Sequence, residues 1–374
     1  IFLLWRHDLL VIKDTVDFLF NYDLNKFGPV NEILFFDIET TGFSRKYNYI
    51  YLIGCMYIEN NTTYIVQFFA ESKEDEINIL KQFKDLLSNH KIIIQFNGNA
   101  FDLPFVEERC SHHDIDLSFD DCVVFDIYKA VKPYSKLLKI NNLKQKSLEF
   151  LLNITRTDQY SGGDLIPVYE DYQKNKSREA LDKLLLHNYE DVYYMGQLVT
   201  LFALKDMFNG QFIVSCFETD TYSNYDGISV TEIKIDITLD SPIPFHISHK
   251  NNLYYIVGNE DKLKISINIL DGELKYFFSD YKNYYYLPFE DMAMHKDVSS
   301  FIDKDHRKQA TAATCYIKKQ SLFVPIIGTE HINDTSLTKR LFKTDYKDSL
   351  DYIEYCVLSD DNIHNYVVSL LSYI

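Results

Sequence analysis

A short apolar run at residues 33–38 (Ile-Leu-Phe-Phe-Asp-Ile) places the strongest constraint on what this chain can fold into. A continuous apolar run of this length predicts a buried strand. Asp37 and Glu39 stand two residues apart at its end, so their carboxylates point to the same face. Burying two like charges is costly because of desolvation and repulsion, and a bound divalent cation would remove both penalties. A strand that ends in water would explain the pair equally well.

The first half of the chain alternates strand and helix patterns. Strands are predicted at residues 33–38, 49–58, 62–70, 91–96 and 122–128, and helices at 73–89, 102–112, 141–152 and 178–206. Residues 1–30 are expected to form a helical segment that packs on this domain. Three meandering strands followed by strand–helix alternation predict an α/β domain over residues 31–205, with a mixed sheet and helices on both faces. The ribonuclease H-like fold has this layout.

In residues 206–374 strand patterns dominate, which predicts a mainly-β accessory domain with helices near its end. Strands are expected at residues 211–217, 230–238 and 253–257. A hairpin is expected at residues 262–278, because Asp271-Gly272 is a preferred pair for a tight primed turn between its arms. The chain of 374 residues is thus divided into three parts, residues 1–30, 31–205 and 206–374.

Charge and composition narrow the class of function. The formal net charge is −17, which argues against tight binding of duplex nucleic acid. A metal-dependent nuclease can still be acidic, because bound cations join its carboxylates to phosphate. The six cysteines contain no C-x-x-C pair, and no apolar run approaches 18 residues. We therefore expect a reduced, cytoplasmic setting and no contact with a membrane.

Two further carboxylates, Asp102 and Asp191, lie at positions where active-site residues are often found. Asp102 precedes Pro104, so it could simply cap a helix, but the same position points a carboxylate past a strand's end. Asp191 lies one helical turn after His187, a spacing that is more often a surface ion pair.

Together, Asp37, Glu39, Asp102 and Asp191 offer the oxygen ligands that suit two Mg²⁺ or Mn²⁺ ions. Such a pair of ions can bind the attacking and leaving oxygens of a phosphodiester. His187 is placed to accept or orient the proton of the attacking water.

Three motifs resemble the DEDD 3′–5′ exonuclease superfamily, which has the ribonuclease H-like fold. They are Phe36 to Gly42, Phe96 to Pro104, and His187 to Asp191, and the second is also similar to that of family-B polymerase proofreading domains. Further residues resemble the bacterial branch called YprB-like: Asn141-Asn142-Leu143-Lys144 with Leu148 and Leu152, and Ser161-Gly162-Gly163-Asp164 with Tyr169 and Tyr172. The resemblance covers about residues 31–205.

The resemblance implies an enzyme that uses two metal ions to hydrolyse single-stranded DNA or RNA from a 3′ end. It also implies that Thr40 and Thr41 contact the terminal nucleotide. Asn97, which could bring backbone close to a ligand, and Phe101, which could stack on a base, complete the expected substrate contacts.

His187 departs from the family pattern. The superfamily usually carries Tyr four residues before the last Asp or His five residues before it, whereas His187 stands four before Asp191. It could act as a base, orient water, or replace the usual residue with weaker activity. Nearby, Tyr189 should face another side of the helix, Asp126 is interpreted as structural, and Glu190 as a solvated charge.

A second function stays open, a non-catalytic nucleic-acid-binding or adaptor protein on a nuclease fold. Residues 295–319 are rich in Lys, Arg and His and follow Tyr284-Tyr285-Tyr286. This combination could grip a nucleic acid or bind a protein partner. A solvated helix beside a Tyr-rich strand would explain the same pattern.

Overall fold

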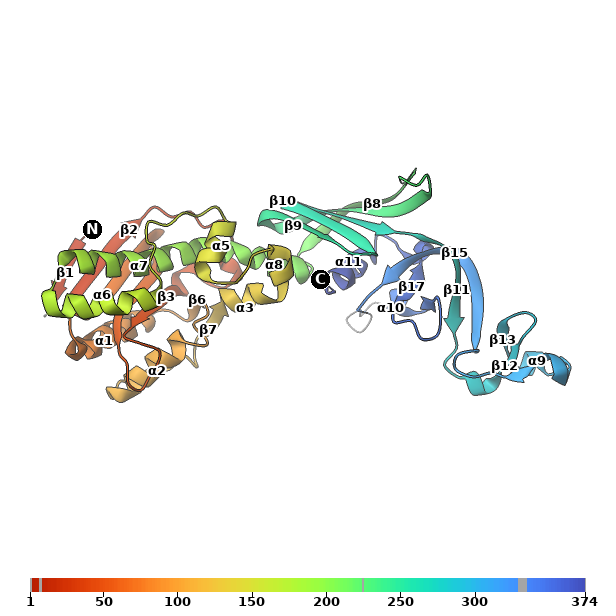
Figure 1. The fold of residues 1–374 in the computed structure, drawn as a ribbon, viewed down its shortest axis with the longest axis horizontal. Coiled ribbons are helices and arrows are strands. Elements are labelled where there is room, and N and C mark those ends of the chain that lie inside the picture. The colour runs from red at the N-terminus through yellow and green to blue at the C-terminus, as the bar shows by residue number, and fades with distance from the viewer. Residues whose placement is uncertain (1, 7–8, 224, 329–334, 374) are drawn as a thin grey trace. The chain divides into compact units, whose positions relative to one another are not determined.

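The computed structural model describes residues 2–6, 9–223, 225–328 and 335–373. Its chain divides into two compact units (Figure 1). One consists of residues 1–205 with 243–245, and the other of residues 206–242 with 246–374. Among the described residues, no helix is long and apolar enough to cross a membrane.

A seven-stranded mixed sheet forms the centre of the first unit, in the order β1-β2-β5-β4-β3-β6-β7. Its strands are β1 (Phe2–Arg6), β2 (Leu9–Val16), β3 (Ile33–Thr40), β4 (Ile50–Glu59), β5 (Thr62–Phe69), β6 (Ile92–Gln95) and β7 (Val123–Asp126). β3 pairs antiparallel with β4 and parallel with β6, so it lies where the two halves of the sheet meet. All five strands predicted in this region are confirmed.

The helical segment expected at residues 1–30 is wrong. β1 and β2 form an antiparallel pair, and β2 continues the sheet beside β5, from Leu10 opposite Phe69 to Val16 opposite Thr63. Only two short 3₁₀ turns follow, η1 (Leu24–Lys26) and η2 (Val30–Glu32). The free edge of β5 explains the difference, because its backbone groups need partners and β-branched residues of β2 suit an extended chain.

Helices flank the sheet (Figure 1). They are α1 (Glu76–Leu87) after η3 (Lys73–Asp75), α2 (Asp102–His112), α3 (Ile127–Val131), η4 (Lys132–Tyr134), α4 (Ser135–Leu138), α5 (Gln145–Leu151), α6 (Gly162–Asn175), α7 (Arg178–Leu198), η5 (Val199–Leu201) and α8 (Phe202–Phe208). Phe36 packs on Phe83 of α1, whereas its neighbour Asp37 meets Asn188 of α7. Adjacent strand residues point to opposite faces, so α1 and α7 cover opposite faces of the sheet.

Helix α6 is not among the predicted elements. Its first residues, Gly162 and Gly163, and the internal Pro167 are poor helix formers. A capping box overrides them, in which Ser161 and Asp164 satisfy each other's backbone N–H groups. Tyr169 and Tyr172 then bury one face of the helix against Phe69. Packing therefore decides this helix more than propensity does.

A buried ion cluster fixes α2 to α1. The carboxylate of Glu76, which is fully buried, accepts hydrogen bonds from Nε and Nη2 of Arg109 at 2.8 and 2.6 Å. It also accepts the backbone N–H of Ile50 and lies 2.8 Å from Nε2 of His113. Because α2 begins at Asp102, the cluster that fixes α2 also fixes the position of this carboxylate.

The second unit is mainly β, as predicted. A three-stranded antiparallel sheet contains β8 (Phe212–Ser223), β9 (Ser229–Lys250) and β10 (Tyr254–Asn268), and a small closed barrel contains β11 (Leu270–Phe277), β15 (Tyr316–Ile326), β16 (Phe342–Lys343) and β17 (Asp351–Glu354). A third sheet contains β12 (Tyr284–Leu287), β13 (Met292–His295) and β14 (Lys308–Gln309). Short helical elements complete it: η6 (Tyr281–Asn283), α9 (Lys296–Ser299), η7 (Lys304–His306), α10 (Thr335–Thr338), η9 (Tyr355–Val357) and α11 (Ile363–Leu371).

The hairpin expected at residues 262–278 is wrong. β10 and β11 belong to different sheets, and Gly272 lies inside β11, where it pairs with Ser321 of β15. Gly272 also lacks the positive φ that a primed turn requires. The alternation of Ile265 and Ile267 is real, but it reflects one buried face of β10.

Replacing Glu76 with Gln should lower the free energy of unfolding by about 3–5 kcal/mol, because Arg109 then stays buried without its counter-charge. Urea denaturation followed by circular dichroism measures the change. Glu74→Gln, at an exposed position two residues earlier, is the control and should shift stability by less than about 0.5 kcal/mol. Similar values for the two variants would contradict a structural role for this cluster.

Candidate functional site

The carboxylates of β3 lie beneath α7 and have different partners. Asp37 Oδ2 accepts a hydrogen bond from Nδ2 of Asn188 at 3.1 Å. Oδ1 of Asn188 in turn accepts one from Gln67 at 3.0 Å, which fixes the amide. Glu39 is buried, with 6% of its surface exposed, and accepts no hydrogen bond among the described residues. Glu39 therefore does not end in water, whereas Asp37 is half-buried and lines a cleft, so a fully solvated strand end does not explain the pair.

Asp102 reaches β3 from the first residue of α2. Its Oδ1 accepts the backbone N–H of Ile38 at 3.2 Å, between the two acids of the strand. Phe101 occupies the N-cap position, so the helix-capping explanation for Asp102 does not apply. The loop before it is shaped by Asn97, at φ +60°, whose N–H donates to Asp126 Oδ1 at 3.0 Å. Asp126 also accepts from Lys129 N, in agreement with a structural role.

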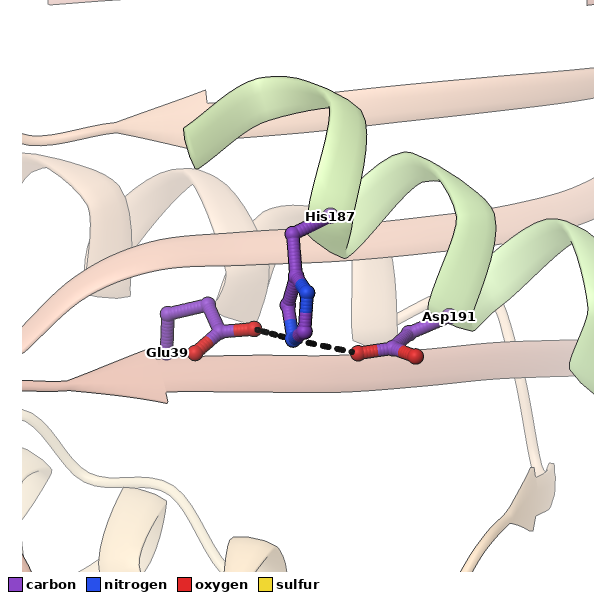
Figure 2. A group of neighbouring side chains, drawn as sticks. All are labelled: Glu39, His187 and Asp191. Atoms are coloured by element: carbon purple, nitrogen blue, oxygen red, sulfur yellow. Dashed lines mark ion pairs between the residues drawn. The ribbon is translucent and has the colours of Figure 1, made fainter. Parts of the chain in front are cut away.

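His187 and Asp191 bring the third element to the same place. Nε2 of His187 lies 3.5 Å from Oε1 of Glu39 and 3.2 Å from Oδ2 of Asp191 (Figure 2). His187 is buried, so this is not a surface ion pair. The structure thus brings the four predicted carboxylates and His187 into one cluster, from β3, α2 and α7.

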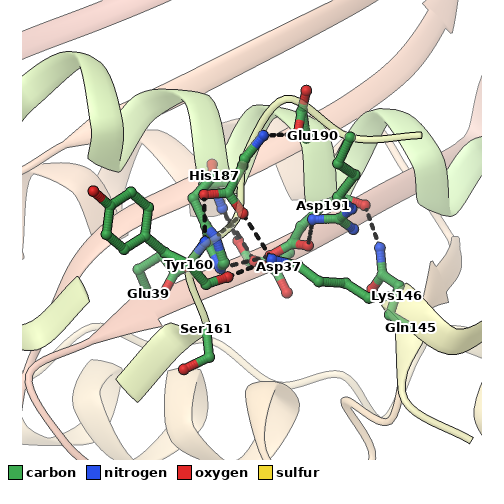
Figure 3. A network of polar contacts seen from close by, with 12 residues as sticks. Asp37, Glu39, Gln145, Lys146, Tyr160, Ser161, His187, Glu190 and Asp191 are labelled. Carbon is green, nitrogen blue, oxygen red and sulfur yellow. Dashed lines mark hydrogen bonds and ion pairs between the residues drawn. The ribbon is translucent and has the colours of Figure 1, made fainter. Parts of the chain in front are cut away.

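Four charged residues around the cluster were missed from sequence, and one of them, Lys146, is labelled in Figure 3. Nδ1 of His187 lies 2.6 Å from Oδ2 of Asp158, and that oxygen also accepts from Lys146 Nζ at 2.8 Å. Arg156 pairs with both Glu149 and Oδ1 of Asp191. Each of these residues comes from the connection between α5 and α6 or from α5 itself, and no spacing in the sequence marks them.

The interpretation of Glu190 as a solvated charge is wrong. Its side chain is 6% exposed and accepts the backbone N–H groups of Thr157 and Asp158 at 3.0 and 2.9 Å. A carboxylate that satisfies two loop N–H groups fixes the loop against α7. Glu190 therefore positions the segment that carries Arg156 and Asp158.

Burial and mutual repulsion make the central acids hard to ionise. Burial raises the pKa of Asp37 and of Glu39 well above the usual value, and the charges of Asp191 and Asp102 raise both further. Burial likewise raises the pKa of Asp102 from 3.8 to about 7, although the Ile38 N–H opposes this. Asp158 differs: burial would raise its pKa, but hydrogen bonding to Lys146 and the contact with His187 leave it lowered. The cluster consequently favours protons or cations.

Of the four expected substrate contacts, Thr40, Thr41 and Phe101 contact other residues of the protein, and Asn97 lines a cleft. Thr40 Oγ1 donates to the carbonyl of Gly42 at 2.8 Å, and Thr41 Oγ1 donates to that of Tyr49 at 3.5 Å, so both hydroxyls are used by the turn. Phe101 packs on Phe105, with ring centroids 5.2 Å apart. Asn97 lines a cleft of about 590 Å³ together with three residues of the cluster; its walls are Asp37, Phe96, Asn97, Tyr128, Leu143, Lys144, Gln145, Lys146, Ser161, Gly162, His187 and Asp191.

The Lys-rich stretch at residues 295–319 meets the tyrosines that precede it. Arg307 lies over the ring of Tyr285 at 4.6 Å, and Lys296 lies over it at 5.2 Å. The ring of Tyr285 is therefore already in contact with two cations from the same part of the chain, Lys296 of α9 and Arg307 just before β14. A nucleic-acid or protein contact through this region stays a prediction.

Comparison with known proteins identifies the fold. The model of the RNase_H superfamily matches residues 34–203. With the mixed sheet and flanking helices, this confirms the ribonuclease H-like fold predicted from the element order. The DEDD assignment and its YprB-like branch stay predictions. No curated protein matches the chain.

Several solved structures are similar over part of the chain. The family B DNA polymerase from the archaeon Pyrobaculum calidifontis has a TM-score of 0.37 at 12% identity, over 70% of this chain and 37% of its own. A structure described as the apo form of a nuclease has a TM-score of 0.31 at 15% identity, over 50% of this chain and 79% of the nuclease. A zinc-bound complex of E. coli exonuclease I with single-stranded DNA has a TM-score of 0.29 at 13% identity, over 55% of this chain and 54% of the exonuclease. The chain thus spans little more than half of the exonuclease and less of the polymerase.

Replacing Gly54 with Ala should displace Asn188 from Asp37. A Cβ at Gly54 would lie 2.1 Å from Oδ1 of Asn188, which is too close for either side chain to stay in place. We expect the free energy of unfolding to fall by about 1–3 kcal/mol in urea denaturation. Gly163→Ala is the control, since its Cβ would meet no atom closer than 4.0 Å. Equal stabilities of the two variants would contradict this account of Asn188.

The stability of the metal-free protein should fall as the pH rises from about 4 to about 7. Over this range the folded protein keeps a proton on Asp102, whose pKa is raised to about 7, while the unfolded chain has released it. Asp102 contributes its full stabilisation at a pH below its pKa in the unfolded chain. This contribution is lost as the pH rises through its pKa of about 7 in the folded protein. Asp102→Asn, which keeps the shape without the charge, should show a flatter profile in EDTA. Equal slopes for the two proteins would contradict the raised pKa.

Proposed function

We propose that this chain, with its ribonuclease H-like fold at residues 34–203, is a metal-dependent nuclease that hydrolyses phosphodiester bonds. One observation carries the proposal. Carboxylates from three separate elements, Asp37 and Glu39 of β3, Asp102 of α2 and Asp191 of α7, meet in a buried cluster beside a cleft. A cluster of this kind is costly unless a cation binds it, and proteins place such groups at functional sites.

The residues present fit divalent ions. Glu39 is buried without a hydrogen bond among the described residues, and burial together with the neighbouring acids raises the pKa of both Asp37 and Glu39. Oxygen donors of this type suit Mg²⁺ or Mn²⁺. Two such ions, held by Asp37, Glu39, Asp102 and Asp191, would supply the Lewis acidity that phosphodiester hydrolysis requires.

The surrounding side chains orient this set. Asn188 fixes Asp37, the backbone of Ile38 fixes Asp102, and Arg156 fixes Asp191. Lys144 and Lys146 line the same cleft as Asp37 and Asp191, so a phosphate backbone entering it would meet lysine side chains as well as acids.

The finer features of the reaction rest on the motif resemblance. We propose a single strand of DNA or RNA as substrate, cleaved from the 3′ end, with Thr40, Thr41, Asn97 and Phe101 as contacts of the terminal nucleotide. Asn97 is the best supported of the four, because it lines the cleft. A protein partner would bind through residues 206–374.

A non-catalytic binding or adaptor protein is the second candidate. The pairing of Arg156 with Asp191 favours it, because a guanidinium already gives this carboxylate a counter-charge without a metal ion. This function would need the cleft and the second unit, and it would not need hydrolysis.

Replacing Asp37 or Asp102 with Ala should reduce cleavage on the order of 10²–10³-fold or more, because each removes a carboxylate that would hold the divalent ions, and those ions would stabilise the negative charge of the transition state. The assay uses labelled single-stranded DNA and RNA in Mn²⁺ and in Mg²⁺, with the label placed at either end to reveal polarity. Asp85→Ala, an exposed acid on α1, should cleave like the wild type.

Two outcomes would count against the enzyme. If the wild-type protein cleaves no strand under these conditions but binds metal or oligonucleotide, the binding function is favoured. If both Ala variants cleave at the wild-type rate, the carboxylate cluster is not the active site.

A further inference from the structure

The imidazole of His187 lies inside the carboxylate cluster. Its Nε2 is 3.2 Å from Oδ2 of Asp191 and 3.5 Å from Oε1 of Glu39, and one donor atom from each of the three residues lies within 4.8 Å of the others (Figure 2). Two ligands of one ion, each about 2.1 Å from it, lie roughly 3.0 Å apart in octahedral and about 3.4 Å apart in tetrahedral geometry. The separations of Nε2 from the two carboxylates are of this size.

Asp158 determines which nitrogen of His187 is available. Its Oδ2 lies 2.6 Å from Nδ1, so Nδ1 is the nitrogen placed to donate a proton to Asp158, and in the neutral imidazole Nε2 then carries the lone pair. Asp158 is itself 4% exposed and fixed by Lys146 and by the backbone N–H of Tyr160 at 3.1 Å. A carboxylate on the far nitrogen of a histidine is the usual support of a metal-binding imidazole.

The surroundings of Glu39 independently indicate a cation-binding site. Its side chain is more than nine-tenths buried, and its described partner, Nε2 of His187, is too distant for a strong hydrogen bond. Buried carboxylates are normally paired, hydrogen-bonded or bound to metal. At Asp191, Arg156 takes Oδ1 and leaves Oδ2 facing the same point as Glu39 and His187.

We infer that His187 binds a metal ion through Nε2, together with Glu39 and Asp191, and does not serve as the base that its motif position suggests. A site with one imidazole and two carboxylates favours a first-row transition ion such as Mn²⁺ or Zn²⁺ over Mg²⁺, because Mg²⁺ prefers oxygen ligands. Asp158 is then a positioning residue, which acts on the ion through His187. The inference deepens the proposed function and rests on it.

Pulsed electron paramagnetic resonance of the Mn²⁺-loaded full chain tests this ligand directly, because it detects nitrogen bound to Mn²⁺. The wild type should show imidazole nitrogen coupling, and His187→Ala should lose it. His90→Ala removes another buried histidine of the same unit and should keep it. Coupling that persists in His187→Ala, or is absent from a wild type that binds Mn²⁺, overturns the inference.

Calorimetry with Mn²⁺ and Mg²⁺ provides a second measurement that does not require nuclease activity. His187→Ala should weaken Mn²⁺ binding tenfold or more while changing Mg²⁺ binding little, whereas a merely structural role would weaken both alike. Asp158→Asn keeps His187 in place and should weaken Mn²⁺ binding roughly 10–100-fold. It keeps the inference testable if His187→Ala does not fold, and a wild-type affinity in Asp158→Asn contradicts it.

Failure of the inference and failure of the proposed function are distinguishable. A wild type that binds Mn²⁺ and cleaves single strands without nitrogen coupling from His187 keeps the nuclease and loses this ligand. In that case His187 only makes polar contacts with the surrounding carboxylates. A wild type that binds neither ion loses both.

Discussion

Repulsion among buried carboxylates is the constraint on which the rest of the first unit depends. Asp37 and Glu39 lie in β3, whose other residues are almost entirely buried. The neighbouring strand β4 offers them only backbone pairing, and the pairing with β6 ends at Phe35. The compensation must therefore come from outside the sheet. Helix α7 supplies part of it through the amide of Asn188, whereas Asp191 of α7 and Asp102 of α2 add negative charge, so the rest is left to protons or cations. Helix α2 is itself fixed by the Glu76 cluster.

Helix α7 meets this need with almost consecutive residues. His187 contacts Asp158 and Glu39, Asn188 contacts Asp37, Glu190 accepts the loop N–H groups, and Asp191 pairs with Arg156. Successive residues of a helix are rotated by about 100°, so neighbouring side chains face different partners. One turn of α7 thereby joins β3 to the loop before α6, and a shift of that turn would disturb Asp37, Glu39, Asp191 and the loop residues that contact them.

The sequence predicted what is locally encoded. Apolar runs and the three motifs were enough for β3, α2, α7 and the four carboxylates, because strand and helix spacing fix which side chains share a face. It did not reveal Asp158 or Arg156, whose partners on α7 are 29 and 35 residues away and follow from tertiary packing. The errors have the same origin: β2 is a strand because β5 needs a partner, and Gly272 is not a turn because β15 pairs with β11.

The distribution of positive charge gives the cluster its chemistry. Arg156 is shared between Glu149 and Asp191, and Lys146 donates to Asp158, so the two nearby cations are hydrogen-bonded to acids at the rim. Asp37, Glu39 and Asp102 accept no hydrogen bond from a Lys or Arg in the described part of the chain; Asp37 is bonded to an amide and Asp102 to a backbone N–H. Since burial raises the pKa of all three, their charge is balanced only by protons or by added cations. The rim cations thus orient the ligands without neutralising the centre, which is the arrangement that a divalent ion requires.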